Sequence, residues 1–343
     1  MMSFTEFDAT GIELERISCD LCGGNETTLE FEAKDIRYGL PGSFNVVRCR
    51  KCHLVFTNPR PLKRASNAYY PDDYRPHIGG KREYENWFGA VYRRMAFSRK
   101  ANLFSRMLGD VYNHLAYRQF VSKEVDPALV LDVGCGTGDY LGVWRELGWN
   151  VQGLEMDDSA AGIAKKKLGF CVGVGRLAEA TLPAAGFDLV AMSHVLEHMH
   201  SPSLALRKIA HVLKPGGRIL ITVPNYASWD RHVFGPRWQG LEVPRHLYHF
   251  EPQSLSVMLE SEGFAIEQMG SSAHPGSLIR SIRGLCKKGR PSGRISSVER
   301  CLGWFVQLVP ALLMCGTSLW VVARLRSGRE PLGENGKSAG KTT

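Results

Sequence analysis

The sequence predicts a doubly wound α/β fold, in which helices cover both faces of a mostly parallel sheet. The first observation is an apolar run over residues 129–133 that ends in Gly134, Gly136 and Gly138. Apolar residues then recur at helical spacing, so this glycine loop joins a buried strand to a helix N-terminus. The second observation is that short strand-like runs alternate with helical patterns over residues 129–224. Glycines at such a turn let a ligand approach the backbone N–H groups closely.

Length and composition set the limits of the prediction. A chain of 343 residues with 44% hydrophobic content can bury a full core and carry additions. The first sixteen residues are mixed and acidic, which argues against a secretory leader and predicts a cytoplasmic protein. The net charge of +9 is concentrated in residues 48–106 and 280–300. We expect an anionic substrate or a membrane surface as its partner, since no basic motif interleaved with aromatic residues indicates nucleic acid.

Four of the nine cysteines form two Cys-x-x-Cys pairs, Cys19 with Cys22 and Cys49 with Cys52. Four thiolates can close a tetrahedral shell around one ion, which predicts a structural zinc site. The odd number of cysteines argues against a disulfide framework. A redox dithiol is the alternative for either pair alone. We therefore expect a zinc ribbon over residues 1–62.

The remaining segments follow the same alternation. Aromatic and apolar residues at spacings of three and four predict a helical connector or lid over residues 63–124. The main domain is expected over 125–326. Its further predicted elements are strands at 151–154, 171–174, 187–192 and 218–223, helices at 204–213 and 252–262, and a late antiparallel hairpin of 265–269 with 319–324.

These motifs together carry a resemblance. The loop reads Gly-x-Gly-x-Gly with Asp132 two residues before its first glycine, and the second strand ends in Glu155, where a carboxylate can accept both ribose hydroxyls. With the four cysteines and the Asn58-Pro-Arg-Pro61 connector, the chain resembles class I S-adenosylmethionine-dependent methyltransferases, in particular the zinc-ribbon sugar C-methyltransferase branch. The resemblance implies a Rossmann-like, seven-stranded methyltransferase sheet. A structural glycine turn in another α/β domain is the alternative.

The resemblance also implies site residues. The cofactor would be bound by residues of the glycine loop and of the ends of the second, third and fourth strands: Asp132, Gly134, Cys135, Gly136, Glu155, Met156, Leu177 and Ser193. Arg176 stands where an acidic residue usually frames the adenine, so a backbone N–H at Leu177 would do so instead. Asn225 and Tyr226 would border the acceptor.

Methyl transfer needs an aligned acceptor and, for a protonated acceptor, a base. The segment 238–250 corresponds to a region that carries a catalytic Glu-His pair in the sugar C-methyltransferases, and His246 matches that histidine. Arg245 replaces the glutamate, which predicts binding of an anionic acceptor. His246 is the first candidate for the base, with acceptor binding or a structural role at the start of a helix as alternatives. His194 is the rival base.

The C-terminal part is strongly apolar. Residues 301–323 carry no charge and are flanked by Arg300 and Arg324, a length that could span a bilayer. Polar and helix-breaking residues interrupt the run, so we favour an apolar helix inserted near 295–316, with peripheral membrane contact through 280–316. The polar tail over 327–343 is expected to be disordered.

The sequence therefore predicts an S-adenosylmethionine-dependent methyltransferase with structural zinc, acting at oxygen or carbon of a sugar, a nucleotide sugar or another small anionic acceptor. Two alternatives remain open. A nucleotide-sugar dehydrogenase or epimerase would share a glycine loop and an acidic ribose ligand. A non-catalytic zinc-ribbon scaffold or nucleic-acid binder would retain the fold without the activity.

Overall fold

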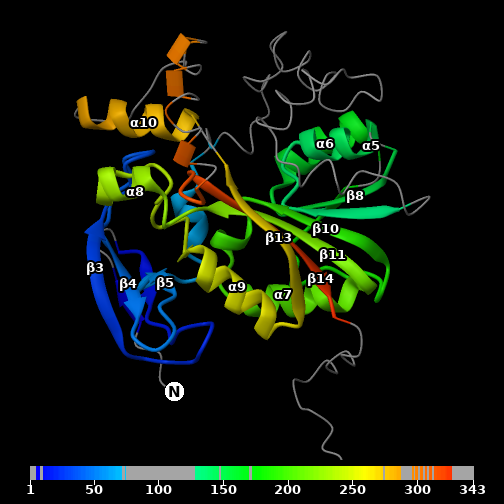
Figure 1. Ribbon diagram of the computed structural model, residues 1–343, viewed down its shortest axis with the longest axis horizontal. Coiled ribbons are helices and arrows are strands. Elements are labelled where there is room, and N and C mark those ends of the chain that lie inside the picture. Colours follow the sequence, from blue (N-terminus) through cyan, green and yellow to red (C-terminus); the bar gives the residue numbers. More distant parts are fainter. Residues whose placement is uncertain are drawn as a thin grey trace, which may run out of the picture.

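The computed structural model describes residues 5–7, 11–71, 74, 128–146, 148–169, 172–272, 275–286, 296, 298–299, 302–303, 306, 309–310 and 313–326 (Figure 1). Most of the connector predicted over 63–124 lies outside the described residues, as do the tail and part of the segment 295–316, where an inserted helix is predicted. In the part that is described, residues 66–69 form a short 3-10 helix, η1. No helix among the described residues is long and apolar enough to cross a membrane.

The centre of the molecule is a seven-stranded sheet with the order β13-β14-β11-β10-β7-β8-β9. Six strands run in the same direction, and β14 runs antiparallel to both of its neighbours. The predicted seven-stranded sheet and late hairpin are therefore confirmed. The strands are β7 (Leu129–Val133), β8 (Asn150–Glu155), β9 (Val172–Val174), β10 (Phe187–Ser193), β11 (Leu213–Pro224), β13 (Phe264–Ser272) and β14 (Ser318–Leu325).

Helices cover both faces of this sheet (Figure 1). On one face lie α5 (Asp139–Glu146) and α6 (Asp158–Leu168), and on the other α7 (Pro202–Val212) and α9 (Pro252–Ser261). Side chains alternate along each strand, so Val130 packs with Trp144 of α5, whereas Leu131 belongs to the core that includes α7 and α9. This alternation is why a run of apolar residues is needed in a strand that is buried on both faces.

The cysteine-containing segment forms a second sheet with the order β12-β5-β4-β3. Strands β3 (Thr27–Ala33), β4 (Phe44–Cys49) and β5 (Val55–Thr57) come from the N-terminal part, but β12 (Tyr248–His249) comes from the loop before α9. Phe56 of β5 and Cys49 of β4 belong to the same apolar cluster as Leu131 of the main sheet. The two sheets therefore share one core.

Smaller elements complete the described part. Strands β1 (Thr5–Phe7), β2 (Glu13–Glu15) and β6 (Arg60–Pro61) form a third sheet. The short helices η2 (Leu196–His198), α8 (Trp229–Phe234) and η3 (Gly235–Arg237) lie in the loops that follow β10 and β11, and α10 (Pro275–Cys286) follows β13. The loops after β10 and β11 thus lie at the carboxyl ends of the parallel strands, where ligands of such sheets collect.

Candidate active site

The glycine loop between β7 and α5 is held by backbone hydrogen bonds to the end of β8. Gly134 N donates to Leu154 O over 2.7 Å, and Gly136 N donates to Oε2 of Glu155 over 2.7 Å. The other carboxylate oxygen of Glu155 accepts from Asp157 N over 2.9 Å. Each carboxylate oxygen has two lone pairs, so both keep capacity for a further hydrogen-bond donor.

The first glycine of the loop is required by its conformation and by its neighbours. Gly134 has φ of +69°, and a Cβ atom there would lie 2.5 Å from Cγ2 of Val195. Because Val195 follows β10, this contact joins the glycine loop to the loop that carries His194 and Glu197. Gly136 and Gly138 also have positive φ values, so the whole turn depends on residues without a side chain.

A small recess opens beside this loop at the carboxyl ends of β7, β10 and β11. Asp132, Ser193 and Thr222 contribute polar side chains to its wall, and Trp144 of α5 contributes an apolar one. Asp132 is buried, as are Cys135 and Leu177, whereas Met156 is 42% exposed. The structure thus places Asp132 and Ser193 at one recess and the glycines and Glu155 beside it.

His194 stands at the end of β10 in a strained conformation. Its φ is +55°, a value that is uncommon for any residue other than glycine. The backbone holds it there, since His194 N donates to Thr222 O over 2.8 Å. Its Nδ1 lies 3.3 Å from Oε1 of Glu197, and its side chain is 40% exposed. His194 is therefore oriented by a buried carboxylate while part of its ring stays accessible.

His246 lies on the other side of the same carboxylate. Its Nδ1 is 2.9 Å from Gly240 O, and its Nε2 is 3.9 Å from Oε1 of Glu197. The His246 ring meets that of His198 edge to face, with 4.6 Å between the ring centroids. Burial, followed by the effect of His198, lowers the pKa of His246 to about 4, and burial also lowers the pKa of His198. Both imidazoles are thus neutral at pH 7.

The sequence analysis identified His194 and His246 but assigned no chemical role to Glu197 and His198. Glu197 is fully buried. Burial would raise its pKa, but the hydrogen bond with His194 and the proximity of His194, His198 and His246 lower it. The dipeptides Glu197-His198 and Arg245-His246 can be read from the sequence. The closeness of residues 197–198 to residue 246 cannot, because it depends on tertiary packing.

Arg245 was expected to bind an anionic acceptor, and the structure places its guanidinium among protein groups. Nη2 donates to Oδ1 of Asp35 over 2.6 Å, Nη1 donates to Oδ2 of Asp35 and to Tyr69 O, and Nε donates to Oε1 of Glu242. The side chains of Arg245 and Asp35 are both fully buried. Glu242 also pairs with Arg37. These contacts tie the segment 242–246 to the ribbon sheet.

Asn225 and Tyr226 follow β11, as predicted, and are also engaged by protein groups. Asn225 Nδ2 donates to Met314 O and Gly316 O, and its Oδ1 accepts from Ala227 N. The Tyr226 hydroxyl bonds Glu30, and the guanidinium carbon of Arg231 lies 3.9 Å from the centroid of the Tyr226 ring. Both residues are buried. They fix the loop that precedes α8 against the start of β14 and against the ribbon sheet.

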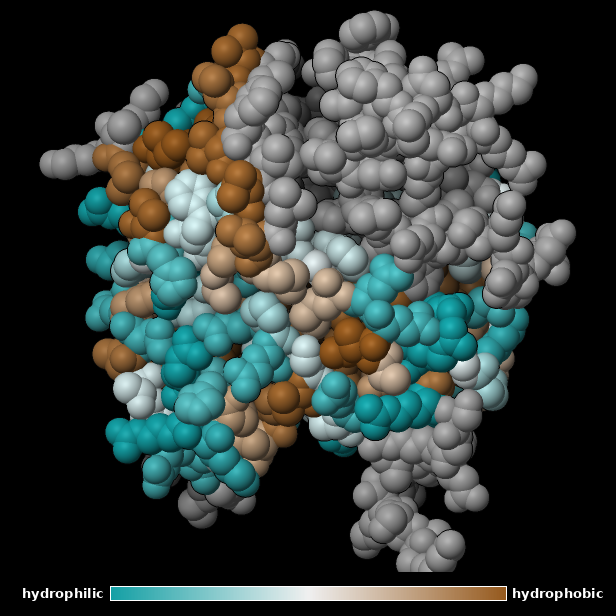
Figure 2. All heavy atoms as spheres, viewed as in Figure 1, coloured by the Kyte–Doolittle hydropathy of each residue, from teal (hydrophilic) through white to brown (hydrophobic). Residues whose placement is uncertain are grey.

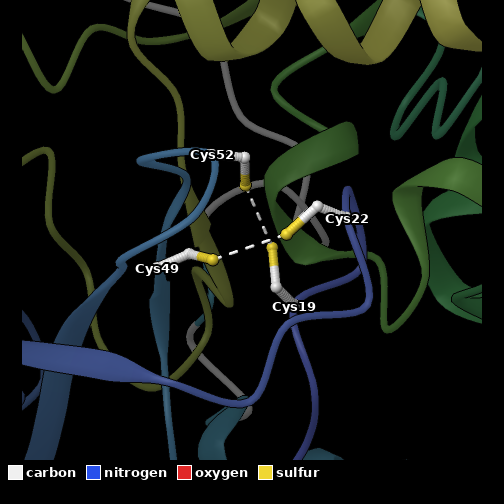
Figure 3. A group of neighbouring side chains, drawn as sticks. All are labelled: Cys19, Cys22, Cys49 and Cys52. Atoms are coloured by element: carbon white, nitrogen blue, oxygen red, sulfur yellow. Dashed lines mark hydrogen bonds between the residues drawn. The ribbon is translucent and has the colours of Figure 1, made fainter.

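The four predicted cysteines converge, as Figure 3 shows. Their sulfur atoms all lie within 4.8 Å of one another, with 3.4 Å between Cys19 and Cys52 and 3.5 Å between Cys22 and Cys49. Tight backbone turns support both pairs, since Gly23 N donates to Cys19 O and His53 N donates to Cys49 O. Burial raises the pKa of the Cys52 thiol to about 11, although the Leu54 N–H group lowers it.

Comparisons with known proteins agree with the fold. Residues 105–269 match a family model described as a methyltransferase domain. The chain is 30% identical over 158 residues to a protein of Mycolicibacterium smegmatis named as an S-adenosylmethionine-dependent methyltransferase, covering 46% of this chain and 57% of the relative, so it spans little more than half of that protein.

Two further relatives are named as O-methyltransferases. The chain is 27% identical to a malonyl-[acyl-carrier protein] O-methyltransferase of Serratia marcescens, with 49% of this chain and 68% of the relative covered. It is 28% identical to a ubiquinone biosynthesis O-methyltransferase of Xanthomonas axonopodis, with 44% and 69% covered. Among solved structures, an S-adenosylmethionine dependent methyltransferase from Mesorhizobium loti aligns with a TM-score of 0.44 and 20% identity, covering 61% of this chain and 96% of the other.

Proposed function

We propose that the chain is a class I S-adenosylmethionine-dependent methyltransferase that transfers a methyl group from S-adenosylmethionine to a small acceptor. The match of residues 105–269 to a methyltransferase domain and the similarity to the Mycolicibacterium smegmatis protein support this proposal. The observation that carries the proposal is the bond from Gly136 N to Glu155. It brings the glycine loop and an acidic strand end together at the carboxyl edge of the sheet. The ribose hydroxyls would donate to the remaining lone pairs of Glu155, and the methionine part would lie toward Asp132 and Ser193. Cys135, Met156 and Leu177 would surround the rest of the cofactor.

The position of His194 supports a role for this residue in removing a proton from the acceptor. It stands beside Ser193 at the proposed methionine end, and Glu197 orients its Nδ1. A carboxylate that holds one imidazole nitrogen leaves the other to accept a proton from the acceptor, in the manner of a catalytic triad. His246 is deeper and its Nδ1 faces Gly240 O. His246 would act on the acceptor directly, through its Nε2 atom, or indirectly, through its effect on the carboxylate of Glu197.

Substitution of the two histidines tests this assignment. His194→Gln should lower turnover by about 100-fold or more, since general base catalysis contributes about that much, while S-adenosylmethionine binding persists. His246→Ala should also lower turnover. His211→Gln is the control, because His211 is exposed on α7. Unchanged turnover in His194→Gln would remove His194 from the role of base.

For the acceptor we propose a sugar, a nucleotide sugar or another small anionic molecule, methylated at oxygen or carbon. The sequence resemblance to the sugar C-methyltransferases supports a glycan-related molecule, and the two relatives named as O-methyltransferases support oxygen as the methylated atom. Arg245 would act by positioning the segment that carries His246, since its own donors bond protein groups. Mass spectrometry of candidate nucleotide sugars, glycans and carboxylic acids for a gain of one methyl group tests the proposal. Methylation of none of them would contradict it.

We also propose that Cys19, Cys22, Cys49 and Cys52 hold a structural zinc ion. Zinc bound to four thiolates at about 2.3 Å places the sulfur atoms roughly 3.8 Å apart, and the two closest pairs are at 3.4 and 3.5 Å. Four sulfur ligands leave no position for a substrate. The ion would therefore stabilise the ribbon and the core that it shares with the main sheet.

The C-terminal segment supports peripheral membrane contact, with an anionic lipid surface as the partner. Val298, Leu302, Val306, Val309 and Leu313 recur at spacings of three and four, and each side chain is more than half exposed. Figure 2 shows apolar residues gathered at this end of the molecule, beside α10 and above α8. Lys287, Lys288, Arg290 and Arg294 precede this stripe in the sequence, as in basic amphipathic segments that bind membranes.

Sedimentation with phospholipid vesicles tests this contact. The full chain should sediment with vesicles that contain an anionic lipid and much less with vesicles of phosphatidylcholine alone. Val306→Asp should reduce the bound fraction, whereas Val257→Asp, at an exposed position on α9, should not. Equal sedimentation of the two variants would contradict the assignment of the stripe.

A further inference from the structure

The carboxylate of Glu197 is an unsatisfied buried group. The side chain is fully buried, and within the described part of the chain its Oε2 has no hydrogen-bond partner. Its Oε1 contacts Nδ1 of His194 at 3.3 Å. A buried carboxylate oxygen without a donor or a cation is destabilising. Such a group requires an explanation, and its neighbours supply one.

Those neighbours are two imidazoles whose hydrogens point elsewhere. Nδ1 of His246 is 2.9 Å from Gly240 O, and Nδ1 of His198 is 3.0 Å from Arg245 O. A carbonyl oxygen can only accept, so each Nδ1 carries its ring's hydrogen and each Nε2 keeps a lone pair. In His198 the Tyr70 hydroxyl also lies 3.2 Å from Nδ1, where its oxygen can accept. Metal-bound histidines commonly have this arrangement, in which a backbone carbonyl fixes the other ring nitrogen.

The three side chains converge on one point. One potential ligand atom from each of Glu197, His198 and His246 lies within 4.8 Å of the other two. The Nε2 atom of His246 is 3.9 Å from Oε1 of Glu197. Three potential ligand atoms therefore lie close together, and a small cation among them would satisfy the unpartnered Oε2 of Glu197.

We propose that Glu197, His198 and His246 form a second metal site that takes a divalent transition-metal ion such as Zn²⁺, Fe²⁺ or Mn²⁺. Two imidazoles and one carboxylate are a donor set that suits these ions. Bonds of about 2.1 Å place ligands roughly 3.0 to 3.5 Å apart, so small side-chain movements close the shell. Three protein ligands leave at least one position open.

The surrounding chain fixes these ligands in place. Leu247 N donates to Glu197 O over 2.8 Å, and Thr57 Oγ1 donates to His246 O over 3.1 Å. The main sheet, the ribbon sheet and the segment 240–247 thus all support the site. It differs in chemistry from the four-cysteine cluster, because it offers nitrogen and oxygen and keeps an open position next to His194. With Nε2 of His246 bound to the ion, proton removal would fall to His194, and the ion would polarise an acceptor oxygen brought to the open position.

Cobalt(II) is the probe that distinguishes the two sites in the full chain. Metal is removed under reducing conditions and Co²⁺ is added back while the absorption spectrum is recorded. The first equivalent should produce the intense sulfur-to-cobalt charge-transfer band of thiolate ligands. A second equivalent should add weaker visible bands without a further increase of that charge-transfer band. Wild-type protein that binds a single equivalent, all of it thiolate-bound, would overturn the proposal, whichever way the variants behave.

Variants then assign the second equivalent. Glu197→Gln and His246→Gln should each lose it while keeping the thiolate-bound equivalent and its charge-transfer band, which also reports that the ribbon is folded. His249→Gln is the matched control, since His249 is a buried histidine three residues away that contacts Thr57, and it should bind both equivalents. Retention of the second equivalent by His246→Gln would overturn the assignment. Because metal binding is measured without methyl transfer, these results are independent of the proposed enzymatic activity.

Discussion

Gly136 donates its backbone N–H to the carboxylate of Glu155 over 2.7 Å, although the two residues are 19 positions apart in the sequence. The bond joins the turn after β7 to the end of β8. At Gly134 the same turn lies too close to Val195 of the loop after β10 to leave space for a side chain. Three adjacent strands therefore meet at one backbone turn, and the geometry of the proposed cofactor site depends on the absence of side chains there.

Substitution of Gly134 tests this dependence. In Gly134→Ala the new methyl group would overlap Val195, and φ of +69° would become strained. We expect a loss of at least about 2 kcal/mol in the free energy of unfolding and weaker cofactor binding. Gly142→Ala is the control, since Gly142 lies in α5 and a Cβ atom added there would meet no other atom within 4 Å, and it should be neutral or stabilising by up to about 1 kcal/mol. Urea denaturation of both variants provides the comparison. Equal stability of the two variants would show that Val195 moves and makes space for the methyl group.

Much of the fold follows from local patterns in the sequence. The strands β7 and β10 are continuous apolar runs because both of their faces are buried, and such runs can be recognised without tertiary information. The late hairpin of β13 and β14 was expected from the fold class and not from a local pattern of this kind, because β13 is only partly buried. Strand β12 was not predictable, because two residues carry no periodicity and Tyr248–His249 is a strand only through its pairing with β5.

The sequence indicated where most residues of the site lie, but it was less informative about what each of them does. The glycine loop, Glu155, His194 and the four cysteines stand in recognisable motifs. The partners of Arg245 were hidden, because Asp35 lies 210 residues away in the sequence and no local pattern relates the two. The grouping of Glu197 and His198 with His246 depends in the same way on contacts between distant segments.

The four-cysteine cluster should release one zinc ion when its thiols are blocked. Titration of the purified full chain with a mercurial that modifies thiols should release zinc in proportion to thiolate loss. The melting temperature should fall as well, because Cys49 and Phe56 pack in the same core as Leu131. Cys315→Ser is the control, since Cys315 lies outside the cluster. Purified protein without zinc, or zinc that remains after all thiols have reacted, would refute the site.

The buried pair of Arg245 and Asp35 should behave as a structural ion pair. Arg245→Met would leave the carboxylate of Asp35 buried without its guanidinium partner and Glu242 paired with Arg37 alone, and we expect a loss of about 3 to 5 kcal/mol. The double variant Arg245→Met with Asp35→Asn should recover part of this loss. Arg218→Met, which removes a partly exposed ion pair with Glu267, should cost less than about 1 kcal/mol. Chemical denaturation measures the free energy of unfolding of all three variants. An Arg245→Met protein as stable as the wild type would contradict a structural role for this ion pair.

Buried His249 should make the fold sensitive to acid. Burial, followed by the charges of His246 and Arg231, lowers the pKa of His249 to about 3, against about 6.5 in an unfolded chain. Between pH 6.5 and 3 the unfolded state binds more protons than the folded state, so stability is lost as the pH falls through this window. The loss from this group between pH 7 and 5.5 should be about 1 kcal/mol. His249→Phe should reduce the pH dependence by that amount in urea denaturation. An unchanged slope would show that His249 is protonated in the folded protein.

The most direct test of the central claim is isothermal titration calorimetry with S-adenosylmethionine, S-adenosylhomocysteine and NAD. The wild-type chain should bind the first two and show no heat with NAD. Glu155→Ala should lose about tenfold or more in affinity, since it removes the proposed ribose ligand and the bond to Gly136, whereas Asp158→Ala, an exposed carboxylate at the start of α6, should bind as the wild type does. Binding of NAD in place of S-adenosylmethionine, or unchanged affinity in Glu155→Ala, would contradict the account.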